Sequence, residues 1–350
     1  MTKLKIAVAG AGLIGRDHIK LVDANDRCDL VAIVDPTESA RILAAELNTP
    51  YFCSLSDLFA CDLPDGVILA TPNHLHVQQT FECMDAGVSA LVEKPIAHDL
   101  AEGVKLCAEV EASDAKILVG HHRAHSPIVS LAKELIRDNA LGDLVAITGS
   151  ATFYKPDDYF DASPWRTQPG GGPILINMIH EIGNLRQLCG EIVAVQAMTS
   201  SARRGFAVED TAAISLRFEN GALGTFLLSD TAGSARSWEQ TSQENKSYST
   251  YPDEDCYVIA GTDGSLAIPT MRLKRFSRKE DRSWWKPFEC SSLSLERKDP
   301  LELQLEHFCS VIRGECEPLV SVRDGLQNLR ITEAITNAAK TGSLIEIDRI

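Results

Sequence analysis

The sequence predicts an α/β protein with an N-terminal doubly wound parallel sheet and a C-terminal α+β domain that contains a large, mostly antiparallel sheet. The first observation is that short apolar runs alternate with helical patterns over the first 120 residues. The second is that longer strand patterns dominate after Pro127. Apolar strands separated by helices are typical of a parallel sheet covered on both faces, which explains the first half of the prediction.

A length of 350 residues favours two domains over a single core. We place the first domain at 1–123 and the second at 124–350. Strands of the first domain are expected at 4–9, 30–34, 66–70, 90–92 and 117–120, with helices between them. In the second domain we expect strands at 144–153, 192–200, 211–218, 222–229, 256–260 and 265–268, and helices at 128–139, 174–188, 301–312 and 323–340. The polar segment 231–255 is read either as a functional or interface loop or as a mobile surface loop.

Composition and charge exclude several classes of partner. Hydrophobic residues make up 44% and charged residues 24%, which is ordinary for a globular protein. A net charge of -15 would repel a polyphosphate, so we expect no nucleic-acid partner. The sequence has no uncharged apolar run of about 18 residues and no leader pattern, so we expect no membrane partner. Ten cysteines without a Cys-x-x-Cys pair indicate reduced thiols, which favours a cytoplasmic location.

A glycine-rich segment directly follows the first expected strand and opens a helix. Its pattern is Gly10-x-Gly12-x-x-Gly15, with Leu13 and Ile14 between the last two glycines. Such glycines form a tight turn, let the backbone approach a pyrophosphate and permit close packing of helix on strand. The N-terminus of the helix then offers N–H groups to the phosphates. The segment therefore predicts a Rossmann dinucleotide-binding domain.

An acidic residue at the end of the second expected strand identifies the dinucleotide. Asp35 lies 20 residues after Gly15, where a carboxylate accepts hydrogen bonds from the adenosine ribose. It would repel a 2′-phosphate, and no arginine follows until Arg41. The sequence therefore predicts NAD as the cofactor, in preference to NADP.

Three further stretches carry candidate functional residues. Thr71-Pro72-Asn73-His74 and Glu93-Lys94-Pro95 each end a strand at the carboxyl edge of the parallel sheet, where ligands bind in open α/β folds. In the second domain, Trp165-Arg166 precedes three consecutive glycines and a helix that carries Asn177 and His180. We expect these stretches to contribute to the reaction.

Together these motifs resemble the glucose–fructose oxidoreductase/inositol dehydrogenase/MocA (Gfo/Idh/MocA) family. The matching pieces are GAGLIG, VDP, ATPNHLHV, EKP, WR and GGGPILINMIH, in this order. The resemblance implies an NAD-dependent dehydrogenase that exchanges a hydride with a secondary alcohol or hemiacetal carbon of a sugar, cyclitol or related polyol. It also implies a homodimer or homotetramer, formed through the open face of the second sheet, and a reaction without a metal.

The resemblance assigns the catalytic roles to Lys94 and His180. His180 would be the general base, and Lys94 would contact the substrate hydroxyl and the nicotinamide ribose. The alternatives are a surface salt bridge between Lys94 and Glu93, a core role for His180, and a capping or packing role for His76. The cofactor-binding candidates are Gly10, Gly12, Leu13, Ile14, Gly15, Asp35, Thr71, Asn73, His76, Glu93 and Lys94. The substrate candidates are Arg123, Trp165, Arg166, Asn177 and His180.

The chain departs from the family pattern at one position. Many relatives carry aspartate four residues before the histidine, where this chain has Ile176. Asn177 shares a helix face with His180, but an amide cannot accept a proton as a carboxylate does. The particular substrate therefore stays open, and so do three alternatives. These are a dihydrodiol dehydrogenase, a non-catalytic NAD-binding regulator and a hydrolase that uses tightly held NAD. Three histidines in the run 121–125 suggest a metal site, but no carboxylate or cysteine completes the cluster, so we expect none.

Overall fold

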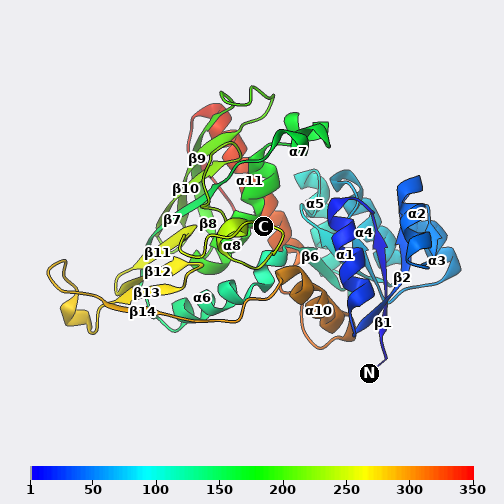
Figure 1. Cartoon of the computed structure of the whole chain (residues 1–350), viewed down its shortest axis with the longest axis horizontal. Helices are drawn as coiled ribbons and strands as arrows, with labels where there is room; N and C mark the ends of the chain where they lie inside the picture. Colours follow the sequence, from blue (N-terminus) through cyan, green and yellow to red (C-terminus); the bar gives the residue numbers. More distant parts are fainter. Residues whose placement is uncertain (1) are drawn as a thin grey trace. The chain divides into compact units, whose positions relative to one another are not determined.

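A computed structural model describes residues 2–350 and divides the chain into two compact units (Figure 1). The first unit contains the chain up to His125, together with Pro300–Leu329 and Ile350. The second contains Ser126–Asp299 and Arg330–Arg349. The chain first passes from the first unit to the second after His125, close to the boundary that we expected after residue 123. The chain returns to the first unit at residue 300, however, so 124–350 is not one continuous unit.

The first unit is built on a six-stranded parallel sheet, which confirms the expected fold of this region. Its strand order is β3-β2-β1-β4-β5-β6, so the order reverses between β1 and β4. Ligands in such folds bind beyond the carboxyl ends of the strands at this reversal. The strands are β1 (Leu4–Ala9), β2 (Cys28–Val34), β3 (Tyr51–Phe52), β4 (Gly66–Leu69), β5 (Ser89–Glu93) and β6 (Ile117–Gly120). The intervening helices are α1 (Leu13–Ala24), α2 (Glu38–Glu46), α3 (Leu55–Cys61), α4 (His76–Asp85) and α5 (Leu100–Glu111).

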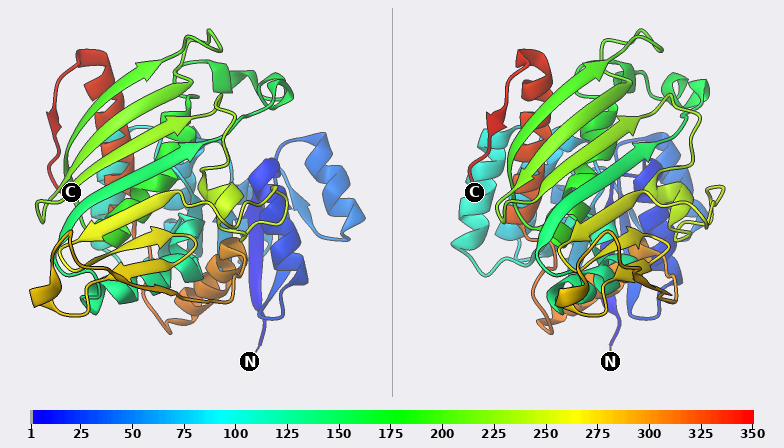
Figure 2. Two further views of the ribbon diagram at one scale, coloured as in Figure 1. Left: turned by 60° about the vertical axis from the view of Figure 1, so that its left-hand side comes forward. Right: turned by 90° about the vertical axis from the view of Figure 1, so that its left-hand side faces the viewer.

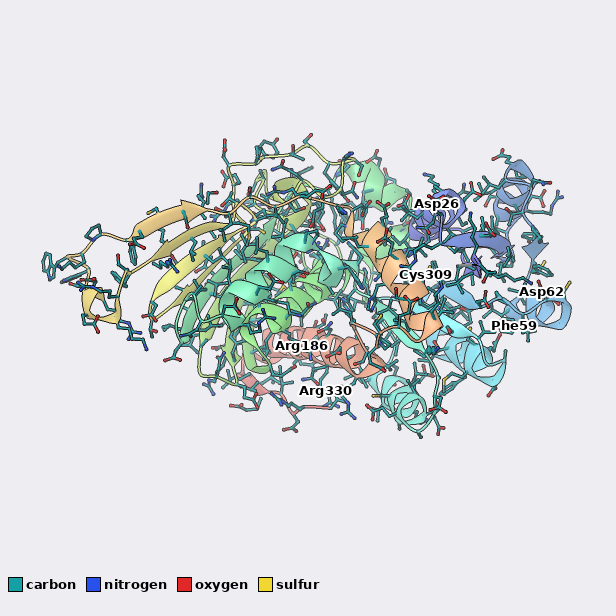
Figure 3. The ribbon with its side chains drawn as sticks, turned by 90° about the horizontal axis from the view of Figure 1, so that it is seen from below. Asp26, Phe59, Asp62, Arg186, Cys309 and Arg330 are labelled. Atoms are coloured by element: carbon teal, nitrogen blue, oxygen red, sulfur yellow. The ribbon has the colours of Figure 1, made fainter. Side chains whose placement is uncertain are left out.

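A C-terminal helix completes the core of the first unit. Helix α10 (Pro300–Arg313) contributes the fully buried Phe308 and Cys309, and Figure 3 labels Cys309 on this helix. Gly66 permits the close approach, because a Cβ there would lie 2.8 Å from the side chain of Ile312. The periodicity of α10 predicts one apolar face but not which core receives it, which explains the difference from the expected domain boundary. Helix α11 (Val322–Thr341) begins in the first unit and ends in the second.

The second unit is built on a nine-stranded sheet in the order β14-β13-β12-β11-β7-β10-β9-β8-β15. Strands β7 and β10 pair in parallel and the other neighbours are antiparallel, which confirms a mostly antiparallel sheet. The strands are β7 (Leu144–Thr152), β8 (Ile192–Ser200), β9 (Thr211–Phe218), β10 (Leu223–Ser229), β11 (Tyr257–Gly261), β12 (Gly264–Ile268), β13 (Arg272–Arg275), β14 (Glu289–Ser292) and β15 (Ile345–Glu346). The helices are α6 (Pro127–Arg137), α7 (Asp157–Asp161), α8 (Ile179–Cys189) and α9 (Trp238–Thr241).

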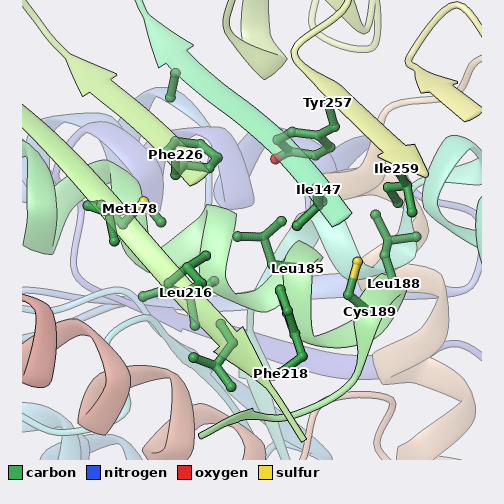
Figure 4. Packing of buried hydrophobic residues seen from close by; sticks show 14 of the residues in the cluster. Ile147, Met178, Leu185, Leu188, Cys189, Leu216, Phe218, Phe226, Tyr257 and Ile259 are labelled. Atoms are coloured by element: carbon green, nitrogen blue, oxygen red, sulfur yellow. The ribbon is translucent and has the colours of Figure 1, made fainter. Parts of the chain in front are cut away.

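One face of this sheet forms the core of the second unit. Phe226 and Tyr257 project from the strands toward Met178 and Leu185, as Figure 4 shows. Side chains on the other face alternate with them and are exposed, and Figure 2 views the sheet from this uncovered side. Met198, Leu223, Leu227 and Val258 are large apolar residues on that face. We call it the open face.

The segment 231–255 is partly packed into the second unit. Helix α9 lies within it, and Trp238 is buried with its indole N–H donating to Glu244 at 3.0 Å. The hydroxyl of Ser126 donates to the same carboxylate. The central part of the segment is therefore anchored, whereas Tyr248 and Tyr251 are exposed. A mobile surface loop does not describe the region around α9.

All ten cysteines carry free thiols, and six of them are buried. Burial raises the pKa of the Cys83 and Cys189 thiols to about 12, so these groups behave as small apolar residues. Over residues 2–350, no helix has both the length and the apolar character that a membrane-spanning segment needs.

Candidate nucleotide and substrate sites

The three glycines of the first loop have different roles. Gly10 has a φ of +91°, and a Cβ there would lie 2.4 Å from the carbonyl oxygen of Ala70. A Cβ on Gly15 would lie 2.0 Å from the carbonyl oxygen of Gly10, so both positions require glycine for packing. Gly12 faces open space, with no heavy atom within 4 Å of a Cβ there. It is also the N-cap of α1 and makes no side-chain cap, so first-turn N–H groups can receive a phosphate.

Asp35 lies beside this loop at the end of β2. One oxygen of its carboxylate accepts a hydrogen bond from the backbone N–H of Ala11 at 2.8 Å. The other accepts from the backbone N–H of Thr37, also at 2.8 Å. The hydroxyl of Thr37 donates to this second oxygen as well. The carboxylate is thus fixed at the edge of the loop, and the oxygen that faces Ala11 keeps a lone pair for a ribose hydroxyl. Leu13 is 75% exposed and Ile14 half-buried, so both are open to a ligand on the same turn. The residues present therefore fit a dinucleotide.

His76 joins the ends of two neighbouring strands. It is buried at the start of α4, and its ring nitrogens lie 2.8 Å from the carbonyl oxygen of Pro95 and 2.9 Å from that of Thr71. Burial lowers its pKa, against the effect of these two carbonyls. His76 therefore fixes the loops that follow β4 and β5, in line with the packing role left open by the sequence. Asn73 is half-buried and begins the 3₁₀ turn Asn73–Leu75 beside them.

Glu93, which precedes Lys94, is buried and does not lie on the surface. Its carboxylate lies 2.9 Å from Nε2 of His18 on α1 and accepts the backbone N–H of Lys94 at 3.2 Å. Burial acts to raise the pKa of Glu93, but the hydrogen bond and charge of His18 outweigh it, so the pKa is lowered. Lys94 is half-buried and precedes a cis proline. Arg123 is buried in the 3₁₀ turn His122–His125 of the same unit.

In the second unit, His180 follows a π-helical turn. The turn covers Ile174–Met178 and leads directly into α8, where His180 is 9% exposed. A π-turn places one additional residue in the helix, and such turns are frequent at functional sites. Asn177 lies within the turn and accepts a hydrogen bond from Nζ of Lys155 at 2.7 Å. Lys155 also lies 3.7 Å from the carboxylate of Asp230.

These side chains belong to a larger polar cluster. The guanidinium of Arg204 donates to Asp230 at 3.0 Å and lies 4.5 Å from the ring centre of Phe160. Burial raises the pKa of Asp230, although the cations Lys155 and Arg204 oppose this shift. Glu209 accepts the backbone N–H of Ile174 at 2.8 Å, and burial raises its pKa as well. The π-turn that leads into α8 is therefore surrounded by charged groups rather than by an apolar wall.

Arg166 and Trp165 lie at the edge of this cluster. The guanidinium of Arg166 stacks 3.8 Å from the ring centre of Tyr159, and the same ring lies 4.9 Å from Nζ of Lys155. Nε of Arg166 is buried and has no hydrogen-bond partner in the part of the chain described. Trp165 is 52% exposed beside it.

Sequence reasoning missed Lys155, Arg204 and Asp230, which contact Asn177 directly or through one another. Lys155 and Asp230 follow the adjacent parallel strands β7 and β10, so both lie at the same end of the sheet. A lysine directly before Pro156 at a strand end was the available signal for the first of them. No motif marks Arg204, because its role depends on the pairing of β9 and β10.

Comparison with known proteins identifies the class to which this architecture belongs. Residues 4–121 match the model described as "Oxidoreductase family, NAD-binding Rossmann fold". Residues 133–347 match the model described as "Oxidoreductase family, C-terminal alpha/beta domain". The two matches define an oxidoreductase with an NAD-binding domain, and its cofactor is NAD. The chain belongs to the Gfo/Idh/MocA family, as the sequence motifs predicted.

Relatives extend along nearly the whole chain. D-apiose dehydrogenase of Paraburkholderia graminis is 25% identical over 364 residues, which covers 99% of this chain and 90% of the relative. Inositol 2-dehydrogenase of Rhizobium meliloti is 25% identical over 98% of this chain and 99% of the relative. The solved structure of the WlbA dehydrogenase from Bordetella pertussis, in complex with NADH and UDP-GlcNAcA, has a TM-score of 0.78, 25% identity and 99% coverage of both chains. The chain is thus an oxidoreductase related to enzymes of sugars and polyols.

Proposed function

We propose that this protein is an NAD-dependent dehydrogenase that transfers a hydride between nicotinamide and a secondary alcohol or hemiacetal carbon of a sugar, cyclitol or related polyol. The observation that carries the proposal is that one chain combines a glycine loop open to a dinucleotide with Lys94 and His180 at their motif positions. A regulator without activity would have no need of both side chains. The dehydrogenases named above, which match this chain from end to end, support the same reaction class.

In this proposal each residue has a separate role. Bound NAD supplies the hydride acceptor at the nicotinamide ring. His180 accepts the proton of the substrate hydroxyl, and the cation of Lys94 stabilises the negative charge that develops on its oxygen. Glu93, bonded to His18 and to the backbone of Lys94, positions the lysine. Asn177, held by Lys155, provides an amide for a substrate hydroxyl one residue after the position at which many relatives carry aspartate.

We further propose that NAD is preferred to NADP. The carboxylate of Asp35 is fixed by two backbone N–H groups at the edge of the glycine loop. In that position it would accept the ribose hydroxyls and repel a 2′-phosphate.

The decisive experiment is to follow NADH formation at about 340 nm over a panel of aldoses, inositols, other polyols, sugar acids and cyclic dihydrodiols, with NAD and NADP in parallel. We expect turnover with NAD on a sugar or cyclitol, and the ring type chooses between these and a dihydrodiol. Substrate conversion without net NADH would favour the hydrolase that keeps its NAD. No turnover of any substrate in the panel, with NAD binding intact in calorimetry, would favour the non-catalytic regulator.

We also propose a homodimer or homotetramer formed through the open face. Met198, Leu223 and Leu227 are 75%, 58% and 48% exposed on it, and a flat sheet face with such side chains is typical of an interface. Sedimentation at micromolar concentration tests this, and a monomer would contradict it.

A further inference from the structure

The hairpin at one end of the second sheet differs in charge from the rest of the protein. We call residues 272–288, which include β13 and lead to β14, the basic arm. It projects beyond the strands in Figure 1. The arm contains seven Lys or Arg residues and two acids, a net charge of +5, in a chain whose net charge is -15. The remaining residues therefore carry a net charge of -20.

Two tryptophans lie in the connection of this hairpin. Trp284 is 88% and Trp285 is 82% exposed, and their ring centres are 5.0 Å apart. Phe276 and Phe288 pack against each other at 4.5 Å and close the base of the same loop. Exposed tryptophans beside arginines are the side chains that contribute most to protein interfaces. Leaving two adjacent indoles in water is unfavourable for an isolated chain.

Some cations of the arm form ion pairs with acids of the same unit, and others do not. Arg278 pairs with Asp281, and Arg282 pairs with Asp263. Lys274 and Lys279 have no ion pair in the described part of the chain. The arm therefore presents an apolar pair of rings together with uncompensated positive charge, and its partner should be acidic and should offer an apolar pocket.

One surface of the second unit has both properties. Helix α7 carries three exposed acids in five residues, namely Asp157, Asp158 and Asp161. Beside it lies a cavity of about 590 Å³ whose walls include the rings of Tyr154, Phe160 and Phe206. Arg203 and Arg204 also line this cavity, and Arg204 is paired with Asp230 and Asp157, so the acids left to meet a cationic partner are Asp158 and Asp161 of α7. Another cavity of this unit, about 490 Å³, is lined by the cations Arg236, Arg272 and Lys274, by the acids Asp253, Glu254 and Asp255, and by no aromatic ring. This second cavity has no aromatic wall for the indoles, and two of its lining residues, Arg272 and Lys274, belong to the arm itself.

We propose that the basic arm of one copy of this chain docks on α7 of a second copy, with Trp284 and Trp285 in the aromatic cavity beside it. Contact between two arms is unfavourable, because each carries a net charge of +5. Reciprocal docking, in which each copy provides one arm and one cavity, satisfies both copies and closes the assembly. The inference extends the proposed homo-oligomer but does not depend on the proposed reaction.

The test measures the dimer dissociation constant by sedimentation in Trp284→Ser/Trp285→Ser and in the charge reversal Arg278→Glu/Lys279→Glu. We expect each double variant to weaken the dimer by roughly 30-fold, the scale of an interface hot spot. The reversal Asp158→Lys/Asp161→Lys should weaken it as well, and combining it with the arm reversal should restore most of the affinity. Lys20→Glu, on an exposed position of α1, is the matched control and should have no effect.

Three outcomes would overturn the docking proposal. They are unchanged dissociation constants in the arm variants, no recovery in the combined charge swap, and binding of the full-length wild-type protein to phosphatidylserine vesicles that Trp284→Ser/Trp285→Ser loses while its dimer dissociation constant stays unchanged. NADH formation is measured on the same variants. Because the arm contains no proposed catalytic residue, a dissociated variant that still turns over substrate separates failure of docking from failure of the proposed reaction.

Discussion

The glycine loop of the first unit and the polar cluster around Asn177 in the second unit are built from different parts of the chain. In the loop, the groups offered to a ligand are backbone atoms at Gly12 and the start of α1, and only Asp35 adds a side chain. In the cluster, the polar groups are side chains, and several of them hold one another, as in the contacts of Lys155 with Asn177 and Asp230.

This difference indicates which of the two regions can be altered by substitution to accept another ligand. A loop that requires glycine because backbone atoms leave no room for a Cβ admits few alternatives. A cluster of paired side chains can be rebuilt one contact at a time, provided that each buried charge keeps a partner. Asn177, which is held by Lys155 and follows Ile176, is the position at which we expect such a rebuilding. We therefore expect the first region to determine the cofactor and the second to determine the substrate.

The largest expected effect is on turnover. Lys94→Ala and His180→Ala should each lower kcat by roughly two to four orders of magnitude, because both groups act on the proton and charge of the reacting hydroxyl. NAD affinity, measured by calorimetry, should change little in His180→Ala. Turnover close to wild type in either variant would contradict the catalytic role proposed for that residue.

The next effect separates the glycines of the loop. Gly10→Ala should lower the free energy of unfolding by more than about 3 kcal/mol, because it adds an unfavourable φ to a contact with Ala70. Gly12→Ala is the matched control, since its methyl group meets open space. It should leave the stability of the free protein within about 1 kcal/mol and weaken NAD by roughly tenfold or more. Urea unfolding with and without NAD measures both, and equal stability losses in the two variants would contradict the division of roles.

Lys155→Met tests the cluster in the second unit. It keeps the length of the side chain but leaves the buried Asp230 with Arg204 as its remaining cation, so we expect a loss of about 2 kcal/mol in urea unfolding. KM for the substrate should rise, since Asn177 loses its fixed orientation. Lys340→Met, at an exposed position of α11, should stay within about 0.5 kcal/mol of wild type. A stable Lys155→Met with unchanged KM would show that the cluster does not position Asn177.

Asp35→Asn tests the choice of cofactor. Removing the negative charge should reduce the ratio of the NAD and NADP specificity constants by roughly tenfold, because the 2′-phosphate is no longer repelled. The amide oxygen can accept only one of the two backbone N–H groups that Asp35 binds, so urea unfolding of the variant is measured alongside to check that the glycine loop keeps its fold. A ratio that moves toward NAD would overturn the proposed preference.

The smallest effect is a pH dependence of stability. Burial lowers the pKa of His125 to about 3, with the neighbouring His307 as the second cause. Between the unfolded pKa of 6.5 and about 3, the unfolded chain therefore binds a proton that the folded chain does not. The contribution of neutral His125 to the free energy of unfolding is therefore fully present above pH 6.5. It is lost as the pH falls, and the free energy of unfolding decreases by roughly 0.7 kcal/mol from pH 7 to pH 6. His125→Phe should lack this part of the slope in urea unfolding, and an unaltered slope would exclude His125 as its source.

The glycine loop could be predicted from the sequence, whereas the polar cluster around Asn177 could not. Local patterns predicted the parallel sheet, the glycine loop and Asp35, because each depends on residues close together along the chain. The pairing of β7 with β10 depends on residues nearly 80 positions apart, so the cluster of Lys155 and Asp230 was not predicted. Strands β13 and β14 were missed because the charged residues of the basic arm, such as Arg272 and Lys274, hide the strand pattern.

The return of the chain to the first unit has a consequence for synthesis on the ribosome. The core around β1 and β4 includes Leu305 and Phe308 of α10, which are made about 180 residues after the last strand of that sheet. At the usual rates of translation, roughly 10–40 s pass between the emergence of His125 and that of Leu329. During this interval the nascent nucleotide domain has an incomplete core with exposed apolar surface. Its final folding therefore waits for the end of the chain, and a chain terminated before α10 should be a substrate for chaperones rather than a smaller stable domain.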